Sequence, residues 1–344
     1  MAHYLITGGA GFFGSILKNI LLDRGHSVVS IDLEPDSLRR DGFSSFRGDI
    51  NDESLMERIF SSNRFDGIFH LAALLAHVKK DLHRLWNANV DGTRSVLQFA
   101  EKYGVGHIVF TSSNCLWAKN FDMPVKEDEP PEPIEIYGKS KLEGERILSG
   151  SSKVKSTIFR CPTIMDEGRL GLLGILFAFI DENRKLWVVG DGCNRYQFIY
   201  AKDLAEACIK AIDYGETAVF NIGSDDVKTF NEVYQHVIDR SGSKSRIAHL
   251  PKRLTVLGMK ICFALGLSPL GPYQYKMITS NFVFDTSKIK ARLGWSPTLK
   301  NEEMLLVAYE YYHAHKDEIL RRKEVSAHSS VAKMGIIRFL KWLS

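Results

Sequence analysis

Short apolar runs alternate with longer amphipathic segments through the first half of the chain. Residues 2–7 and 27–32 have the pattern of buried strands, and a helical pattern from Phe13 to Arg24 lies between them and ends at Gly25. The alternation continues with a helix near 53–61, a strand at Gly67–His70, a helix near 81–103, a strand at His107–Thr111, a helix at about Ile136–Leu148 and a strand at Ser156–Arg160. This order predicts an α/β fold with a Rossmann-type, doubly wound parallel sheet.

The pattern is less regular after about residue 162. Pro and Gly interrupt it, although Val219–Ile222 has the pattern of a strand and Phe230–Arg240 that of a helix. We therefore predict a first domain at 1–162, a smaller C-terminal α/β lobe at 163–315 that is interleaved with it, and a tail at 316–344.

The composition is that of an ordinary soluble domain. A chain of 344 residues with 44% apolar positions can bury a sizeable core. Its five cysteines are scattered and form no C-x-x-C pair, which argues against a disulfide framework and against a metal site. Because an apolar strand follows Met1 almost at once, we expect no secretion signal and a cytoplasmic location.

Charge and amphipathicity single out the C-terminal end. Residues 316–344 carry seven Lys/Arg against three Asp/Glu, which accounts for the net charge of +4 and leaves the body nearly neutral, a poor nucleic-acid binder. On a helix, one apolar face would contain Ile336, Ile337, Phe339, Leu340 and Leu343. This pattern fits peripheral membrane contact, a partner groove, or packing on the protein itself. The apolar stretch Leu254–Leu270 is too short to span a membrane and predicts a buried or interfacial helix.

A glycine-rich turn follows the first strand, in the sequence Thr7-Gly-Gly-Ala-Gly-Phe-Phe-Gly14. Glycines at 8, 11 and 14 would permit a tight turn, the approach of a pyrophosphate and close helix packing. The phosphates would then lie at the helix N-terminus, by Phe12 and Phe13. Asp32 ends the second strand, where a carboxylate can accept from ribose hydroxyls and repel a 2′-phosphate, so NAD is favoured over NADP.

A second motif, Tyr137-Gly-Lys-Ser-Lys141, lies on a predicted helix downstream of Thr111-Ser-Ser113. Residues four apart share one helix face, so an ammonium at Lys141 would lie beside the Tyr137 phenol and lower its pKa. Tyr137 would then exchange a proton with a substrate hydroxyl, and Ser113 would hydrogen-bond the same oxygen.

Together the two motifs resemble the extended short-chain dehydrogenase/reductase family, in its NAD-dependent epimerase/dehydratase branch, from about residue 2 to about 315. The resemblance implies catalytic residues Ser113, Tyr137 and Lys141. It also implies a supporting role for Asn89, for which a helix-surface position is the alternative, and a homodimer. The further cofactor contacts that it implies are Asp49, Ile50, Leu71, Ala72, Ala73 and Pro162.

The substrate side departs from the family pattern. Tyr196 stands where the family has an arginine for the substrate diphosphate, Arg195 is displaced by one position, and Thr163 stands where a sugar-contacting Asn is usual. We take these three residues, with Ser113 and Asn114, as the candidate substrate contacts. Asn114-Cys115 follows Ser113 where the family dehydratases have Asp-Glu and the decarboxylases an acid, which disfavours both reactions.

The resemblance therefore favours a sugar epimerase that uses NAD, acting at C4 of a nucleotide-activated hexose through a transient keto intermediate. An NAD(P)-dependent dehydrogenase or reductase of a sugar, a lipid-linked sugar or a sterol-like alcohol is the alternative. A third reading is an NAD-sensing scaffold without turnover, which the intact Ser113, Tyr137 and Lys141 oppose.

Overall fold

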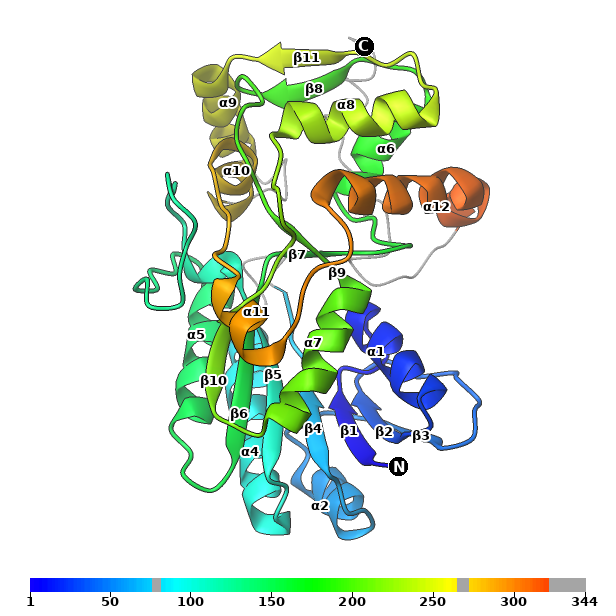
Figure 1. Cartoon of the computed structure of the whole chain (residues 1–344), viewed down its shortest axis with the longest axis vertical. Helices are drawn as coiled ribbons and strands as arrows, with labels where there is room; N and C mark the ends of the chain where they lie inside the picture. The colour runs from blue at the N-terminus through cyan, green and yellow to red at the C-terminus, as the bar shows by residue number, and fades with distance from the viewer. Residues whose placement is uncertain (76–81, 265–271, 322–344) are drawn as a thin grey trace.

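A seven-stranded sheet forms the centre of the larger lobe in the computed structural model, which describes residues 1–75, 82–264 and 272–321. All its neighbouring strands pair in parallel, in the order β10 (Ala218–Asn221), β6 (Lys155–Cys161), β5 (His107–Ser113), β4 (Gly67–His70), β1 (His3–Thr7), β2 (Ser27–Asp32) and β3 (Phe43–Arg47) (Figure 1). The chain order reverses between β1 and β4, where ligands bind in such sheets. The predicted Rossmann-type fold is confirmed.

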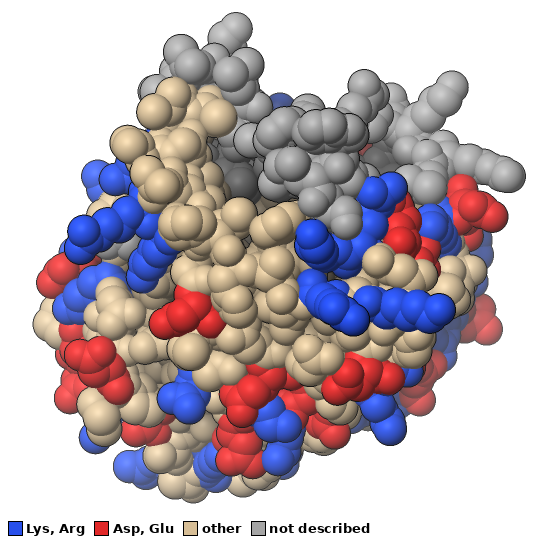
Figure 2. All heavy atoms as spheres, turned by 90° about the horizontal axis from the view of Figure 1, so that it is seen from above, with Lys and Arg blue, Asp and Glu red and all other residues tan. Residues whose placement is uncertain are grey.

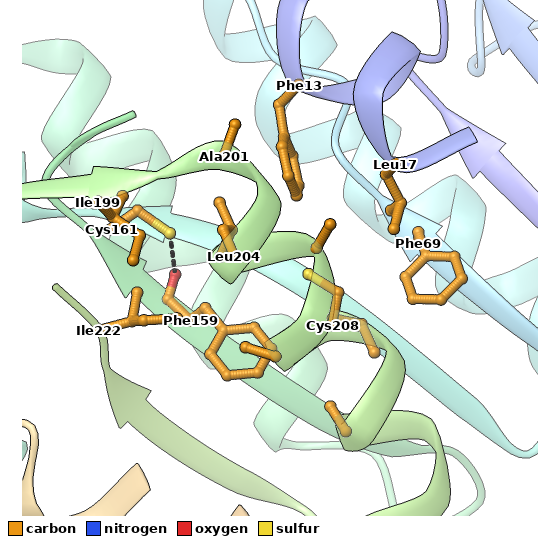
Figure 3. Packing of buried hydrophobic residues seen from close by; sticks show 14 of the residues in the cluster. Phe13, Leu17, Phe69, Phe159, Cys161, Ile199, Ala201, Leu204, Cys208 and Ile222 are labelled. Atoms are coloured by element: carbon orange, nitrogen blue, oxygen red, sulfur yellow. Dashed lines mark hydrogen bonds between the residues drawn. The ribbon is translucent and has the colours of Figure 1, made fainter. Parts of the chain in front are cut away.

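Helices cover both faces of this sheet. Residues alternate along β1, so that Tyr4 and Ile6 pack into one apolar cluster and Leu5 into the other. The first cluster lies under α1 (Phe12–Asp23), α7 (Ala201–Tyr214) and α11 (Ser287–Leu293), and the second under α2 (Glu53–Ser61), α4 (Gly92–Tyr103) and α5 (Ile136–Ser149). Figure 3 shows Phe13 and Leu17 of α1 beside Leu204 and Cys208 of α7.

Two elements differ from the predicted pattern. β3 was missed because it is an edge strand with polar residues at 44, 45 and 47 and no fully buried position. The single helix expected near 81–103 is interrupted: α3 (Leu82–Trp86) leads into a π-helical turn, η2 (Asn87–Asp91), before α4 begins. Such turns are frequent at functional sites, and this one contains Asn89.

The smaller lobe is built on aromatic side chains. Its helices are α6 (Leu173–Asp181), α8 (Phe230–Ser241), α10 (Pro272–Thr279) and α12 (Asn301–Arg321), with two parallel strand pairs, β8 (Leu186–Val189) with β11 (Ile247–Leu250) and β7 (Thr163–Met165) with β9 (Phe198–Tyr200). A capping box formed by Thr229 and Glu232 begins α8, which lies where the sequence predicts a helix. The core of this lobe contains Trp117, Phe177, Tyr196, Phe198, Phe230, Phe282, Phe284, Tyr309 and Tyr312.

The two lobes exchange segments. β10, α7 and α11 follow β7 in the chain but complete the larger lobe, whereas Trp117, from the connection between β5 and α5, packs in the smaller one. Residues on both sides of the cleft therefore come from distant parts of the sequence. The division at residue 162 remains a prediction.

The surface of the smaller lobe carries the predicted apolar stretch. The helix α9 (Lys252–Ala264) exposes Leu254, Leu257 and Ile261, so a buried helix was the wrong alternative for these three side chains. Figure 2, which views the molecule from this end, shows Lys/Arg and Asp/Glu side chains interspersed over the described surface. Within the described ranges, no helix has the length and hydropathy to cross a membrane. The amphipathic pattern of the tail, with Ile336 and Leu343, lies outside the described residues.

Candidate active site

The glycine turn connects β1 to α1 and has no room for side chains. Gly8 has a φ of 77°, and a Cβ there would lie 2.8 Å from the Ala72 nitrogen. A Cβ on Gly14 would lie 2.2 Å from the Gly8 carbonyl oxygen. Gly11 precedes α1 without a side-chain cap, and the first turn of that helix contains no acidic residue. The helix end can therefore receive phosphate oxygens on its N–H groups near Phe12 and Phe13.

The predicted ribose acceptor lies beside this turn. The Asp32 Oδ2 accepts from the Ala10 N–H at 3.0 Å, and its Oδ1 accepts from the Glu34 N–H at 3.0 Å. Each carboxylate oxygen has a further lone pair for a ribose hydroxyl. These bonds fix the carboxylate at the end of β2, so Asp32 also ties the turn to the neighbouring strand.

The segment after β4 lies against the same turn. The Thr7 carbonyl accepts from the Leu71 N–H at 3.1 Å, and the Thr7 hydroxyl accepts from the Ala72 N–H at 3.2 Å. Below them, His70 contacts the Thr7 and Thr93 hydroxyls at 2.7 and 2.9 Å, and burial lowers the pKa of His70 to about 3. A neutral His70 thus connects β1, β4 and α4 below the predicted contacts Leu71, Ala72 and Ala73.

The other predicted adenine-side residues are a surface acid and a core residue. The Asp49 Oδ1 accepts from the Asn51 N–H at 2.9 Å and from the Asn51 side-chain amide at 3.1 Å. Ile50 is buried in the core beneath α4. Contact of this pair with adenine stays a prediction.

The structure brings the predicted catalytic residues together where β5 ends against α5. The Tyr137 hydroxyl lies beside the Ser113 side chain, which acts to lower the pKa of the phenol. One turn further along α5, Lys141 is buried, donates to the Thr111 carbonyl at 2.8 Å and lies 4.6 Å from the Phe110 ring centroid. Ser113, Tyr137 and Lys141 therefore lie together where β5 meets α5, and this group is called the catalytic wall below; their roles stay a prediction.

The expected electrostatics of Tyr137 were wrong in direction. Burial raises the pKa of Tyr137 well above its usual value, and the Arg169 charge and the Ser113 side chain only partly oppose this. Burial also lowers the pKa of Lys141 to about 8. The Lys141 ammonium donates to the Thr111 carbonyl. For Tyr137, the loss of water raises the pKa by more than the neighbouring groups lower it. Tyr137 is thus a neutral phenol at physiological pH.

Asn89 is buried at the π-helical turn, so the helix-surface alternative was wrong. Its Oδ1 accepts from the Leu74 N–H at 2.7 Å, and its Nδ2 donates to the Leu74 carbonyl at 3.1 Å and the Ser140 hydroxyl at 3.0 Å. Ser140 in turn donates to the Tyr137 carbonyl at 2.8 Å. Asn89 therefore positions the catalytic helix relative to the segment after β4.

The predicted substrate residues occupy unlike positions. Asn114 and Tyr196 are both buried, and the Asn114 Nδ2 lies 2.6 Å from the Tyr196 hydroxyl. Pro162 is buried at the end of β6, and Thr163, partly exposed, begins β7. Arg195 is exposed, and its charge acts on Glu232 of α8, whose pKa is lowered first by the hydrogen bonds with Thr229 and then by Arg195. The Arg195 backbone forms an isolated β-bridge with Thr229, the residue before α8.

Sequence reasoning missed a cation at the cleft. Arg169 follows β7, and its guanidinium carbon lies 5.7 Å from the Phe12 ring centroid. Burial lowers the pKa of Arg169 to about 10, whereas Tyr137 and Tyr196 oppose this effect. No spacing rule marks Arg169, since its neighbours come from segments 157 and 32 residues earlier in the chain and 27 residues later.

A buried ion pair behind the catalytic helix was missed as well. The Arg160 guanidinium on β6 donates to the Glu145 carboxylate on α5 at 2.8 to 3.2 Å and to the Glu127 carbonyl at 2.8 Å. Both charged side chains are less than a tenth exposed. The pair fixes α5 against the sheet one turn past Lys141.

The NAD dependent epimerase/dehydratase family matches residues 4–223, which is more than half of the chain. The chain belongs to this family. The description of the family confirms both the predicted resemblance and NAD as the predicted cofactor.

Similar proteins in this family include several sugar-nucleotide enzymes. The UDP-glucose 4-epimerase of Lactobacillus helveticus is 26% identical over 90% of this chain and 97% of its own. The crystal structure of UDP-glucose 4-epimerase with UDP-glucose from Thermotoga maritima has a TM-score of 0.74 at 26% identity, over 91% of this chain and 99% of that one. The uncharacterized protein y4nG of Sinorhizobium fredii is 34% identical over 98% of this chain and 85% of its own.

The family is not limited to one reaction. A UDP-N-acetyl-alpha-D-glucosaminuronate decarboxylase of Bacillus cytotoxicus is 30% identical over 72% of this chain and 83% of its own. Epimerase and decarboxylase relatives thus have similar identities to this family member, and the choice between reactions depends on its own site.

The residues present in this family member fit NAD. The glycine turn forms a cradle that a Cβ at Gly8 or Gly14 would fill, and the uncapped α1 offers N–H donors to a pyrophosphate. Asp32 offers acceptors to ribose hydroxyls and a charge that repels a 2′-phosphate. Lys141 and Tyr137 lie where the nicotinamide end would meet the substrate, by the resemblance described above.

Proposed function

We propose that the protein is an NAD-dependent epimerase that inverts C4 of a nucleotide-activated hexose through a transient keto sugar. The observation that supports this most is the intact catalytic wall, in which Tyr137 lies beside Ser113 and the neighbouring position holds Asn114 bonded to Tyr196. This wall has groups for removing a hydroxyl proton. Its position 114, where the family dehydratases and decarboxylases have an acid, holds a neutral amide.

The side chains divide the work as follows. Ser113 holds the substrate hydroxyl oxygen. Tyr137, once its own proton has passed to solvent, removes the proton from that oxygen and later returns it. The glycine turn and Asp32 would hold NAD, which would supply a reversible hydride acceptor for the sugar carbon and a positive ring that adds to the field at the site. Because burial raises the pKa of Tyr137, the phenolate is a strong base once formed, and Lys141 and Arg169 supply the nearby positive charge.

Inversion also requires that the keto sugar turn over before hydride returns. Asn114 and Tyr196 hold each other at 2.6 Å, so neither is fully available to grip one face of the sugar. This arrangement fits a substrate that the protein binds through its nucleotide, so that the sugar is free to rotate. UDP-glucose and UDP-galactose are the first substrates to test, because the similar enzymes are UDP-glucose 4-epimerases.

The test begins with the dinucleotide that the purified protein retains. After denaturation, chromatography should release near-stoichiometric NAD, since an epimerase regenerates its cofactor in each cycle. Incubation with UDP-glucose or UDP-galactose should interconvert the two without net NADH. Net NADH with an oxidised product would overturn epimerisation in favour of the dehydrogenase alternative, and loss of water from the sugar would identify a dehydratase.

A further inference from the structure

A cation from the smaller lobe lies against the dinucleotide turn of the larger one. Arg169 belongs to the segment that follows β7, and its guanidinium carbon lies 5.7 Å from the ring centroid of Phe12, the first residue of α1. Its backbone N–H donates to the Asp166 carbonyl at 3.1 Å, which forms a tight turn at its base. Arg169 therefore bridges the two lobes at the uncapped helix end.

The guanidinium lacks an anionic partner in the described part of the chain. Asp166 lies three residues earlier, but the cation whose charge acts on its carboxylate is Lys202. The groups whose charge acts on Arg169 are the phenols of Tyr137 and Tyr196, and burial raises the pKa of Tyr137 well above its usual value. A guanidinium that loses water without gaining an anion is costly, so this position favours a bound anion.

The neighbouring groups indicate what kind of anion fits. The α1 end presents N–H donors that suit phosphate, and an arginine fork matches phosphate oxygens in a bidentate manner. Arg195, the residue that the sequence suggested for a diphosphate, is exposed, and its charge acts on Glu232. Tyr196 stands in the arginine position of the family pattern and is bonded to Asn114. Arg169 is thus the better-placed cation.

We propose that Arg169 binds a diphosphate group across the cleft and so holds the smaller lobe against the bound ligand. The inference rests on the proposed function, since that function brings two diphosphates to the cleft, one in NAD and one in the sugar nucleotide. Both offer the same chemistry to a guanidinium. The test must therefore separate the two sources.

The experiment measures binding and does not depend on turnover. The Arg169→Met variant keeps the apolar stem and removes the fork, Arg169→Lys keeps only the charge, and Arg240→Met, on the exposed face of α8, serves as the matched control. Calorimetry with UDP, and with NAD after the retained dinucleotide has been removed, gives the affinity of each variant. Loss of a charge-assisted bidentate contact should weaken one ligand about 10- to 100-fold, with Arg169→Lys intermediate.

Each outcome separates the possibilities. Weaker NAD with unchanged UDP assigns the guanidinium to the dinucleotide, and weaker UDP with unchanged NAD assigns it to the substrate. Affinities of Arg169→Met within twofold of wild type for both ligands, or a wild-type protein that binds neither, would overturn the proposal. If the wild type binds both but does not epimerise, the proposed function fails while the Arg169 assignment is still decided. Circular dichroism checks that every variant is folded.

Discussion

The two lobes support their candidate site residues in different ways. In the larger lobe, close backbone contacts and buried hydrogen bonds fix these residues. In the smaller lobe, the candidate residue Tyr196 is part of an aromatic core. Gly8 and Gly14 leave no space for a Cβ, and Asn89 makes three hydrogen bonds. Across the cleft, Tyr196 packs among Phe198, Phe230 and Phe282 and makes its polar contact with Asn114.

This difference shows how one fold supports several reactions. A backbone cradle admits few substitutions, because the neighbouring main chain cannot move without disturbing the sheet. An aromatic core tolerates exchanges of similar volume, so the residues that stand on it can change more freely. We therefore expect substitutions in the larger lobe to abolish cofactor binding or chemistry, and those in the smaller lobe to change substrate affinity.

The largest effect is expected from Tyr137→Phe, which removes the proton carrier and leaves the ring in place. Turnover should fall roughly 10²- to 10⁴-fold, the range for a lost general acid–base group, while the retained NAD should be unchanged. Tyr214→Phe, on α7 away from the cleft, is the control. Loss of NAD together with turnover would show instead that the phenol supports the cofactor site.

The cradle is tested by Gly14→Ala. The added Cβ would lie 2.2 Å from the Gly8 carbonyl oxygen, and main-chain atoms must shift to admit it. Retained NAD should fall below a tenth of the wild-type content, and the melting temperature should drop by several degrees, as about 1–3 kcal/mol of overpacking implies. Gly106→Ala is the matched control, since a Cβ there meets nothing within 4 Å. Normal NAD content in Gly14→Ala would mean that the turn is more pliable than its contacts indicate.

The next prediction concerns the pH dependence of stability. Burial lowers the pKa of Lys141 to about 8 from its ordinary value of 10.5. The unfolded chain therefore binds more protons between these two pH values, so the stability rises with pH across this window. Below about pH 8 the buried charge costs its full amount, roughly 3 kcal/mol by the size of the pKa difference.

Lys141→Met should thus stabilise the NAD-free protein at pH 7 by up to roughly 3 kcal/mol and lose this advantage between about pH 8 and 10.5, while turnover is lost. Urea unfolding at a series of pH values measures the difference. Lys139→Met, an exposed neighbour on the same helix, should show no such trend. A difference that is constant with pH would contradict the lowered pKa of Lys141.

Much of the larger lobe could be predicted because its signals are local. The glycine spacing, the four-residue spacing of Tyr137 and Lys141 and the strand-and-helix alternation are each fixed by a few neighbouring residues. Arg169 and the direction of the Tyr137 pKa could not be predicted, because they depend on segments that only the folded chain brings together. The exposed edge strand β3 has few apolar residues by which to predict it, and the smaller lobe lacks a short motif of its own.

The smallest effect is expected from Tyr196→Phe, which removes the hydroxyl and keeps the aromatic packing. The Asn114 amide would lose its partner at 2.6 Å, so the KM for the sugar nucleotide should change by about fivefold, close to 1 kcal/mol for one hydrogen bond, with NAD content unchanged. Arg195→Met provides the comparison: the Arg195 side chain is exposed and its charge acts on Glu232, so the KM of this variant should stay within twofold of wild type. A larger effect for Arg195 than for Tyr196 would return the substrate grip to the exposed arginine and break the contrast between the two lobes. Unchanged KM in both variants would instead favour Arg169 as the cation through which the smaller lobe holds the substrate diphosphate.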